Sequence, residues 1–243
     1  MKTNQDAFGQ ELYDFYCGEK TYGIYERDDG AVNVAGNAYY FSEYKDWPPS
    51  IRKALRYAKG TAVDIGCGAA RIALYLQSKG LDVIGIDISP LAIKVSRLRG
   101  LKKAKVMSIT EMTRSIGKFD TLVMLGNNFG LLGSPKQAER LLKRFFQMTS
   151  PNARIIAQTL DPYNTKDKDK LDYHRLNRRR NRMPGQIRLR SRYKTLVSPW
   201  FDYLYVSRKE MKQILIGTGW HVKRFISDAK GPNYIAIIEK EKI

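Results

Sequence analysis

Two apolar segments, joined by a glycine turn and a helix, constrain this chain more than any other feature. The first apolar run contains Asp64 and continues through residues 66–68 (Gly-Cys-Gly) to Arg71, and residues 83–87 form a second run that ends in Asp87. This order predicts strand, glycine turn, helix and strand, which together make a βαβ nucleotide-binding unit. Glycines let a ligand approach the backbone closely, and a terminal acid can accept hydrogen bonds from ribose hydroxyls.

The same segment argues against a dinucleotide cofactor. The fingerprint of NAD- and FAD-binding enzymes needs a third glycine three residues after the second, where helix and strand pack closely. That position is Arg71 here, which is too large for such a contact. Asp64, two residues before the first glycine, has no place in that fingerprint but could accept a hydrogen bond from a cationic amino group. A strand-turn-helix without any ligand remains an alternative.

Residues Val63–Arg71, with Asp87 downstream, resemble motif I of class I S-adenosylmethionine-dependent methyltransferases. Ala70 stands where that family usually has its third glycine. The resemblance implies that residues 66–68 contact the methionine part of S-adenosylmethionine, that Asp64 lies near its amino group, and that S-adenosylhomocysteine is the product. The residues implied in cofactor binding are Asp64, Gly66, Cys67, Gly68, Arg71, Asp87, Ile88, Ser108, Ile109 and Leu125.

Two of these contacts depart from the family pattern. After the third strand the family often has an acid that binds the adenine amino group, and Ser108 could accept that hydrogen bond instead, with Ile88 and Ile109 against the ring. After the fourth strand, residues 127–129 (Asn-Asn-Phe) loosely resemble the Asn-Pro-Pro-aromatic motif of amino-group methyltransferases, without its prolines. Asn127 is therefore a candidate catalytic residue and Asn128 a candidate substrate contact. Alternatively, both asparagines only shape the turn, since asparagine tolerates left-handed geometry.

The remaining periodicity predicts an α/β fold with a doubly wound, mostly parallel sheet. Expected strands are residues 62–65, 82–86, 105–107, 119–125, 153–158, 221–227 and 234–239. Ser89 with Pro90, Ser134 with Pro135, and the capping box that opens at Ser207 predict helix starts. The resemblance implies seven strands, of which the last two form an antiparallel hairpin at the sheet edge.

Two segments fall outside this alternation. Residues 1–58 are predicted to be a helical, aromatic-rich lid that precedes a methyltransferase domain over residues 59–243. Residues 162–206 are predicted to be an α/β insertion on the substrate side, with a helix and two antiparallel strands, 187–193 and 200–206. Residues 126–133, 183–186 and 199–202 also resemble a broad group of small class I methyltransferases of unknown substrate.

The chain is strongly basic, with a formal net charge of +19. Residues 163–194 hold twelve Lys and Arg against three Asp, a net charge of +9. Arg188, Arg190 and Arg192 alternate along one predicted strand and should share a face, which could bind an anionic acceptor. The alternatives are a solvated strand face, a generally basic surface, or a docking surface for RNA.

His174, beside Asp172 and Tyr173 in the insertion, is a candidate general base, although a lone surface histidine is an equally simple explanation. Methyl transfer from a sulfonium depends mainly on proximity and alignment. The sequence thus predicts methylation of N or O on a small, anionic acceptor. Methylation of RNA, or S-adenosylmethionine binding without transfer, are the alternatives.

Composition sets the outer limits. Of 243 residues 43% are apolar, enough for a substantial core, yet no run approaches the ~20 apolar residues of a membrane span. The polar residues 1–6 do not resemble a signal peptide. Two cysteines and two histidines offer few disulfide or metal ligands. We expect a cytoplasmic monomer or homodimer that has no metal site and does not bind membranes.

Overall fold

A computed structural model describes residues 2–241 of the chain. It divides into two compact units, each assembled from separate stretches of sequence. Unit 1 comprises residues 1–47, 59–112 and 189–201, and unit 2 comprises residues 48–58, 113–188 and 202–243. The chain thus passes repeatedly between the units.

The larger sheet has seven strands in the order β11-β12-β7-β6-β3-β4-β5. The pairs β3–β4, β4–β5 and β6–β7 are parallel, and the pairs β12–β7 and β11–β12 are antiparallel. The predicted α/β class, with a mostly parallel seven-stranded sheet and a terminal antiparallel hairpin, is confirmed.

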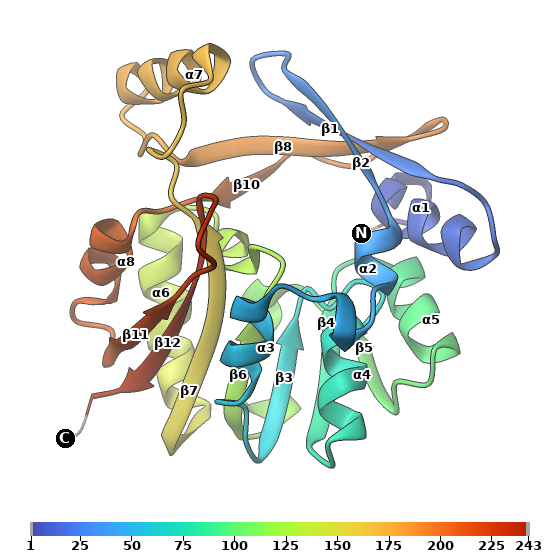
Figure 1. Ribbon diagram of the computed structural model, residues 1–243, viewed down its shortest axis with the longest axis vertical. Helices are drawn as coiled ribbons and strands as arrows, with labels where there is room; N and C mark the ends of the chain where they lie inside the picture. The colour runs from blue at the N-terminus through green and yellow to red at the C-terminus, as the bar shows by residue number, and fades with distance from the viewer. Residues whose placement is uncertain (1, 242–243) are drawn as a thin grey trace. The chain divides into compact units, whose positions relative to one another are not determined.

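In unit 1, each parallel strand leads through a short turn into a helix (Figure 1). The strands are β3 (Thr61–Ile65), β4 (Asp82–Asp87) and β5 (Lys103–Val106), and the helices are α4 (Arg71–Ser78) and α5 (Pro90–Leu98). The Ser89 hydroxyl accepts a hydrogen bond from the Ala92 N–H at 2.9 Å, which caps α5 as its sequence predicts. The carboxyl ends of β3 and β4 therefore open at the same edge.

The N-terminal segment of unit 1 contains strands that its sequence did not lead us to expect. Helix α1 (Ala7–Tyr16) is followed by the antiparallel hairpin β1 (Tyr22–Arg27) and β2 (Val32–Gly36), then by α2 (Ala38–Phe41). Strand β1 also pairs antiparallel with β8 (Gln186–Tyr193), which in turn pairs with β9 (Leu196–Val197). The prediction of an entirely helical, aromatic segment was wrong, because this hairpin extends a second sheet.

Asp6 joins the starts of two helices in unit 1. Its Oδ1 accepts a hydrogen bond from the Gly9 N–H at 2.9 Å and caps α1. Its Oδ2 accepts hydrogen bonds from the Ser89 hydroxyl at 2.8 Å and the Leu91 N–H at 3.0 Å, at the start of α5. Helix α1 packs against α5 (Figure 1). One buried carboxylate thus stabilises both helix starts.

We expect Asp6→Ala to lower the free energy of unfolding by about 2–3 kcal/mol, since it removes a helix cap and leaves buried donors unpaired. Urea denaturation measures this change. Asp167→Ala is the matched control, because Asp167 caps the exposed helix α7 only through nearby N–H groups. It should cost about 1 kcal/mol. An equal loss in both variants would contradict the role of Asp6 in joining α1 to α5.

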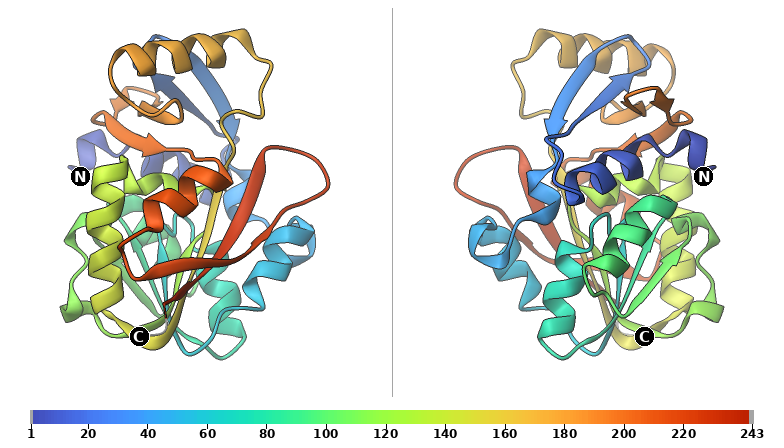
Figure 2. Two further views of the ribbon diagram at one scale, coloured as in Figure 1. Left: turned by 90° about the vertical axis from the view of Figure 1, so that its left-hand side faces the viewer. Right: turned by 90° about the vertical axis from the view of Figure 1, so that its right-hand side faces the viewer.

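Unit 2 contains the other half of the larger sheet and the remaining helices (Figures 1 and 2). The strands are β6 (Phe119–Met124), β7 (Thr149–Leu160), β10 (Phe201–Leu204), β11 (Trp220–Ile226) and β12 (Asn233–Lys240). The helices are α3 (Pro49–Leu55), α6 (Pro135–Gln147), α7 (Lys168–Arg179) and α8 (Arg208–Leu215). The predicted capping box at Ser207 is present, with Glu210 as its second member. Figure 2 shows α3 and α6 on opposite sides of β7 and β12.

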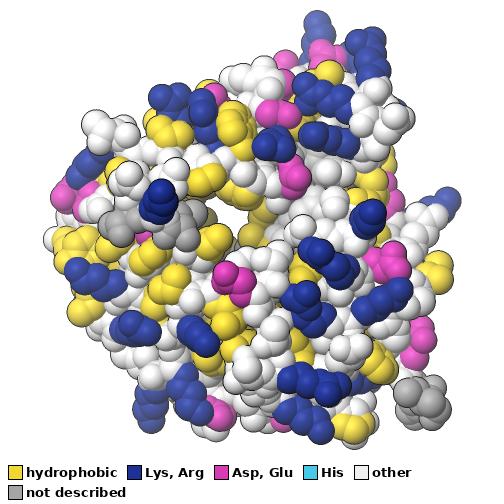
Figure 3. Space-filling model, turned by 180° about the vertical axis from the view of Figure 1, so that it is seen from behind, with side chains coloured by type: hydrophobic (Ala, Val, Ile, Leu, Met, Phe, Trp, Pro, Cys, Tyr) yellow, Lys and Arg dark blue, Asp and Glu magenta, His cyan; other side chains and the backbone are white. Residues whose placement is uncertain are grey.

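The surface carries the positive charge in dispersed form. On the face shown in Figure 3, Lys and Arg side chains are spread over the molecule and alternate with acidic and uncharged groups. In the part of the chain that the structure describes, no helix has the length and apolar character needed to cross a membrane.

Candidate functional site

The glycine turn between β3 and α4 exposes backbone at the carboxyl edge of unit 1. The N–H groups of Gly66 and Cys67 both donate to the Ile86 carbonyl, at 2.9 and 3.0 Å, which ties the turn to β4. Gly66 and Gly68 have positive φ angles of 70° and 53°. Ala70 also has a positive φ, 62°, which explains why glycine is usual there in the family that the sequence resembles.

Asp87, the last residue of β4, is held in place by the same turn. Its Oδ2 accepts a hydrogen bond from the Gly68 N–H, and its Oδ1 accepts one from the Ser89 N–H, both at 3.0 Å. Burial raises the pKa of Asp87 to about 6. Each carboxylate oxygen retains acceptor capacity beyond its backbone bond, so the group can receive hydrogen bonds from a ribose.

Asp64 lies beneath the turn as a second buried acid. Its Oδ2 accepts a hydrogen bond from the Ala73 N–H at 3.2 Å. Burial raises its pKa to about 7, against the opposing effects of this hydrogen bond and of the Arg71 charge. An ammonium group at this edge would favour the ionised form of Asp64. The two acids and the open backbone therefore fit the methionine and ribose parts of S-adenosylmethionine.

Aromatic residues from the N-terminal segment line this turn, a role that the sequence did not reveal. The Arg71 guanidinium lies 3.7 Å from the centre of the Tyr39 ring and 5.2 Å from that of Trp47. A Cβ atom added to Gly68 would lie 3.5 Å from the Tyr40 ring and 3.7 Å from that of Phe8. Spacing along the chain could not signal these contacts, because they depend on tertiary packing.

Three other predicted cofactor residues differ in what they can offer. The Cys67 side chain is buried and lies against Gly85, so only its backbone faces the turn, and burial raises its thiol pKa. Ile88 is exposed and can cover a flat ring. The Ser108 hydroxyl accepts a hydrogen bond from the Thr110 N–H at 3.2 Å, in a capping box before the short helix η3 (Ile109–Glu111).

The predicted turn after the fourth strand lies in unit 2. Leu125 is buried, and the Gly126 N–H donates to Gln158 Oε1 at 2.8 Å. Asn127 has a left-handed φ of 65°, and its carbonyl accepts a hydrogen bond from the Tyr203 hydroxyl at 2.7 Å. The prediction that asparagine shapes this turn is therefore confirmed for Asn127. Its side-chain Oδ1 is buried and finds no hydrogen-bond partner within residues 2–241.

His174 is buried on α7, so the alternative of a lone surface histidine was wrong. Its ring centre lies 6.0 Å from that of Tyr163. Both belong to unit 2. The packing gives His174 a structural role of its own, and its candidacy as a base remains a prediction.

The predicted arginine face is present, but much of its charge is neutralised. Arg190 makes two hydrogen bonds to Glu26 on β1, both at 2.9 Å, and Arg192 contacts the same carboxylate at 3.3 Å. Arg190 also lies over the Trp200 ring. Within unit 2, Arg188 Nη1 lies 3.8 Å from Asp202 Oδ1. Hydrogen bonds from Arg190 foremost lower the pKa of Glu26, as expected for an ionised partner.

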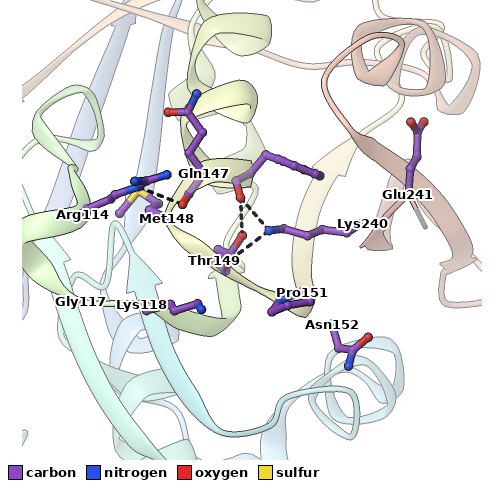
Figure 4. A pocket seen from close by; sticks show the side chains of 11 residues that line it. Arg114, Gly117, Lys118, Gln147, Met148, Thr149, Pro151, Asn152, Lys240 and Glu241 are labelled. Carbon is purple, nitrogen blue, oxygen red and sulfur yellow. Dashed lines mark hydrogen bonds between the residues drawn. The ribbon is translucent and has the colours of Figure 1, made fainter. Parts of the chain in front are cut away.

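A broad hollow of about 1020 Å³ in unit 2 lies away from the carboxyl ends of its strands (Figure 4). Its cations are used to complete the end of α6. Lys240 Nζ donates to the carbonyls of Phe146 and Thr149, and Arg114 Nε donates to that of Gln147. Burial, together with the Lys118 charge, lowers the pKa of Lys240. These contacts indicate a structural role.

Comparison with known proteins agrees with the geometry of the turn. Residues 62–152 match the family described as "Methyltransferase domain". A similar solved structure is an S-adenosylmethionine-dependent methyltransferase from Bacteroides fragilis in complex with S-adenosyl-L-homocysteine. It is 26% identical, the match covers 99% of this chain and 97% of that chain, and the TM-score is 0.84.

Curated relatives match over shorter stretches. The 2-heptyl-1-hydroxyquinolin-4(1H)-one methyltransferase of Mycobacteroides abscessus is 35% identical over 83 residues, 31% of this chain and 37% of that protein. A human lysine N-methyltransferase, named for an ATP synthase component, is 27% identical over 108 residues, 44% of this chain and 46% of that protein. The matched region spans about half the length of these relatives, or less. The chain belongs to the class I S-adenosylmethionine-dependent methyltransferases, and S-adenosylmethionine is its cofactor.

Proposed function

We propose that this enzyme transfers a methyl group from S-adenosylmethionine to a nitrogen or oxygen atom of a small, anionic acceptor. The observation that carries methyl transfer is the turn of residues 66–70 with Asp87 at its edge. The hydroxyquinolone for which one relative is named supports a small acceptor. A second relative is named for lysine N-methylation, which supports nitrogen as a target atom.

The chain's residues have distinct parts in the proposed reaction. S-adenosylmethionine supplies a methyl group on a positively charged sulfur, which needs only an aligned nucleophile nearby. Asp87 and Asp64 hold the cofactor by its ribose and amino groups, and the backbone of residues 66–68 lines its methionine part. Asn127 offers an unpartnered buried carbonyl oxygen that could accept a hydrogen bond from the acceptor. We further propose that residues 1–58 act as a lid and that the insertion 162–206 selects the acceptor.

Charge supports the anionic class of acceptor. The net charge of +19 attracts anions over the whole surface. On β8, Arg190 is committed to Glu26, while Arg192 is half exposed and makes one weaker contact with that carboxylate. Arg192 is therefore the arginine on this strand best able to exchange its partner for a carboxylate or phosphate.

Labelled-methyl transfer into a cell extract, fractionated into small molecules, RNA and protein, tests the proposal. Label in an acidic small molecule is the expected result, and Asp87→Asn should abolish it. Label in RNA, with copurified nucleic acid that a high-salt wash removes, would instead support the RNA alternative. Cofactor binding without label in any fraction would support a binding protein.

A further inference from the structure

Glu11 is a buried acid on α1 that none of the contacts described above uses. Its side chain is fully buried, and its Oε1 accepts a hydrogen bond from the Tyr25 hydroxyl at 3.1 Å. Its Oε2 is buried without a hydrogen-bond partner in the described chain. Gly23 on β1 makes the room for this carboxyl, because an added Cβ there would lie 2.1 Å from Oε2. Such an arrangement is costly unless the carboxyl has a use.

Two tyrosines connect Glu11 to the cofactor turn. Tyr25 forms a side-chain hydrogen bond with Tyr40, on α2. The Tyr40 ring in turn borders Gly68, at 3.5 Å from the position of an added Cβ. Both tyrosines are only half-buried, whereas Glu11 is fully enclosed. A chain of three polar groups thus runs from the enclosed carboxyl to the backbone that lines the cofactor's methionine part.

The surroundings of Glu11 hold it in the protonated form. Burial raises its pKa to about 8, although the Tyr25 hydrogen bond opposes this shift. The other groups of this neighbourhood are Tyr25 on β1, Tyr39 and Tyr40 on α2, and Asp87 on β4. On α1 itself, Asp14 is paired with Lys194 at 2.7 Å. That lysine is committed to another acid, and within residues 2–241 no cation pairs with Glu11.

We propose that Glu11 is a proton-linked counter-ion for the cofactor, which loses its proton to solvent when S-adenosylmethionine binds and regains one when S-adenosylhomocysteine remains. This role rests on the proposed methyl transfer. S-adenosylmethionine carries a sulfonium charge, and a nearby positive charge favours the ionised carboxylate. S-adenosylhomocysteine has a neutral sulfur, so the reaction itself removes the charge that keeps Glu11 ionised. The enzyme would then hold its substrate more tightly than its product.

Calorimetric titration in two buffers of different ionisation enthalpy, at about pH 7.5, counts the protons released on binding. Wild-type protein should release more protons with S-adenosylmethionine than with S-adenosylhomocysteine. Glu11→Gln should remove most of that difference. Asp64 and Asp87 can also release protons, but they remain in both proteins, so the comparison isolates Glu11. An unchanged difference between the two ligands in Glu11→Gln would overturn the proposal, whereas failure of either ligand to bind wild-type protein would overturn the proposed function itself.

Affinity gives a second readout. Because the ionised form of Glu11 favours S-adenosylmethionine, its affinity relative to S-adenosylhomocysteine should rise with pH, by up to about tenfold for each unit by which binding lowers the pKa. Glu11→Gln should flatten this dependence, and Asp14→Asn, one turn along the same helix, should leave it unchanged. A wild-type affinity ratio that does not vary with pH would also contradict the proposal.

Tyr25→Phe keeps the test decisive if Glu11→Gln does not fold, which thermal melting would reveal. Loss of the Tyr25 hydrogen bond removes the effect that lowers the pKa of Glu11. The ligand-dependent proton release should therefore move to higher pH in this variant. No movement would argue against Glu11 as the source of the proton.

Discussion

Asp87→Asn should weaken S-adenosylmethionine binding about 100-fold, which corresponds to about 3 kcal/mol. The carboxylate already accepts the N–H groups of Gly68 and Ser89, one on each oxygen. An asparagine amide has one acceptor oxygen, so its NH2 group would face one of these donors. The variant therefore loses a ribose acceptor and also disturbs the turn that holds the methionine part. Calorimetric titration with S-adenosylmethionine measures the loss.

Asp82→Asn is the matched control for this variant, because it makes the same chemical change at the other end of β4. Asp82 is exposed and pairs with Lys103 at 2.7 Å. Its replacement should change S-adenosylmethionine affinity less than about twofold, since exposed ion pairs contribute little. If Asp87→Asn bound the cofactor as tightly as Asp82→Asn, the assignment of the ribose site to β4 would be wrong.

Gly130→Ala should lower the free energy of unfolding by about 3 kcal/mol. An alanine Cβ at this position would lie 2.0 Å from Cε1 of the Tyr203 ring, which is buried and cannot swing into solvent freely. The displaced ring would also lose the hydrogen bond from its hydroxyl to the Asn127 carbonyl. The midpoint and slope of urea denaturation measure the change.

Gly36→Ala provides the comparison for Gly130→Ala. Gly36 is exposed at the end of β2, and its added Cβ would meet only the Tyr22 ring, at 3.9 Å. This substitution should change stability by less than about 0.5 kcal/mol. Similar small effects in both variants would show that Tyr203 can move aside, and that this packing does not fix the turn.

Local signals predicted the parts of the fold in which each element carries its own boundaries. Ser89 and Ser207 cap α5 and α8 as their sequences indicate, because a cap depends on residues only a few positions away. Strand β7 is longer than the predicted 153–158, since Thr149–Ala153 contains polar residues that tertiary pairing keeps in strand geometry. The glycine turn and Asp87 were predictable for the same reason as the caps.

The β1–β2 hairpin shows what local signals missed. Its apolar residues Ile24, Val32 and Val34 are exposed, so alternation there does not mark a buried face. The Asp29-Gly30 pair between these alternating residues is a hairpin signal that could have located it. The Glu11–Tyr25–Tyr40 chain could not have been found in this way. Its members lie far apart in sequence and meet only once α1, β1 and α2 are packed.

The buried carboxyls at the turn also affect how long the protein survives. Burial raises the pKa of Glu11 from 4.5 to about 8, and that of Asp64 from 3.8 to about 7. The unfolded chain therefore binds fewer protons than the folded one in this range, so stability falls as pH rises from about 4 to 8. Bound S-adenosylmethionine offsets this loss by favouring the folded protein. Cellular supply of the methyl donor would then set not only the rate of the enzyme but its abundance.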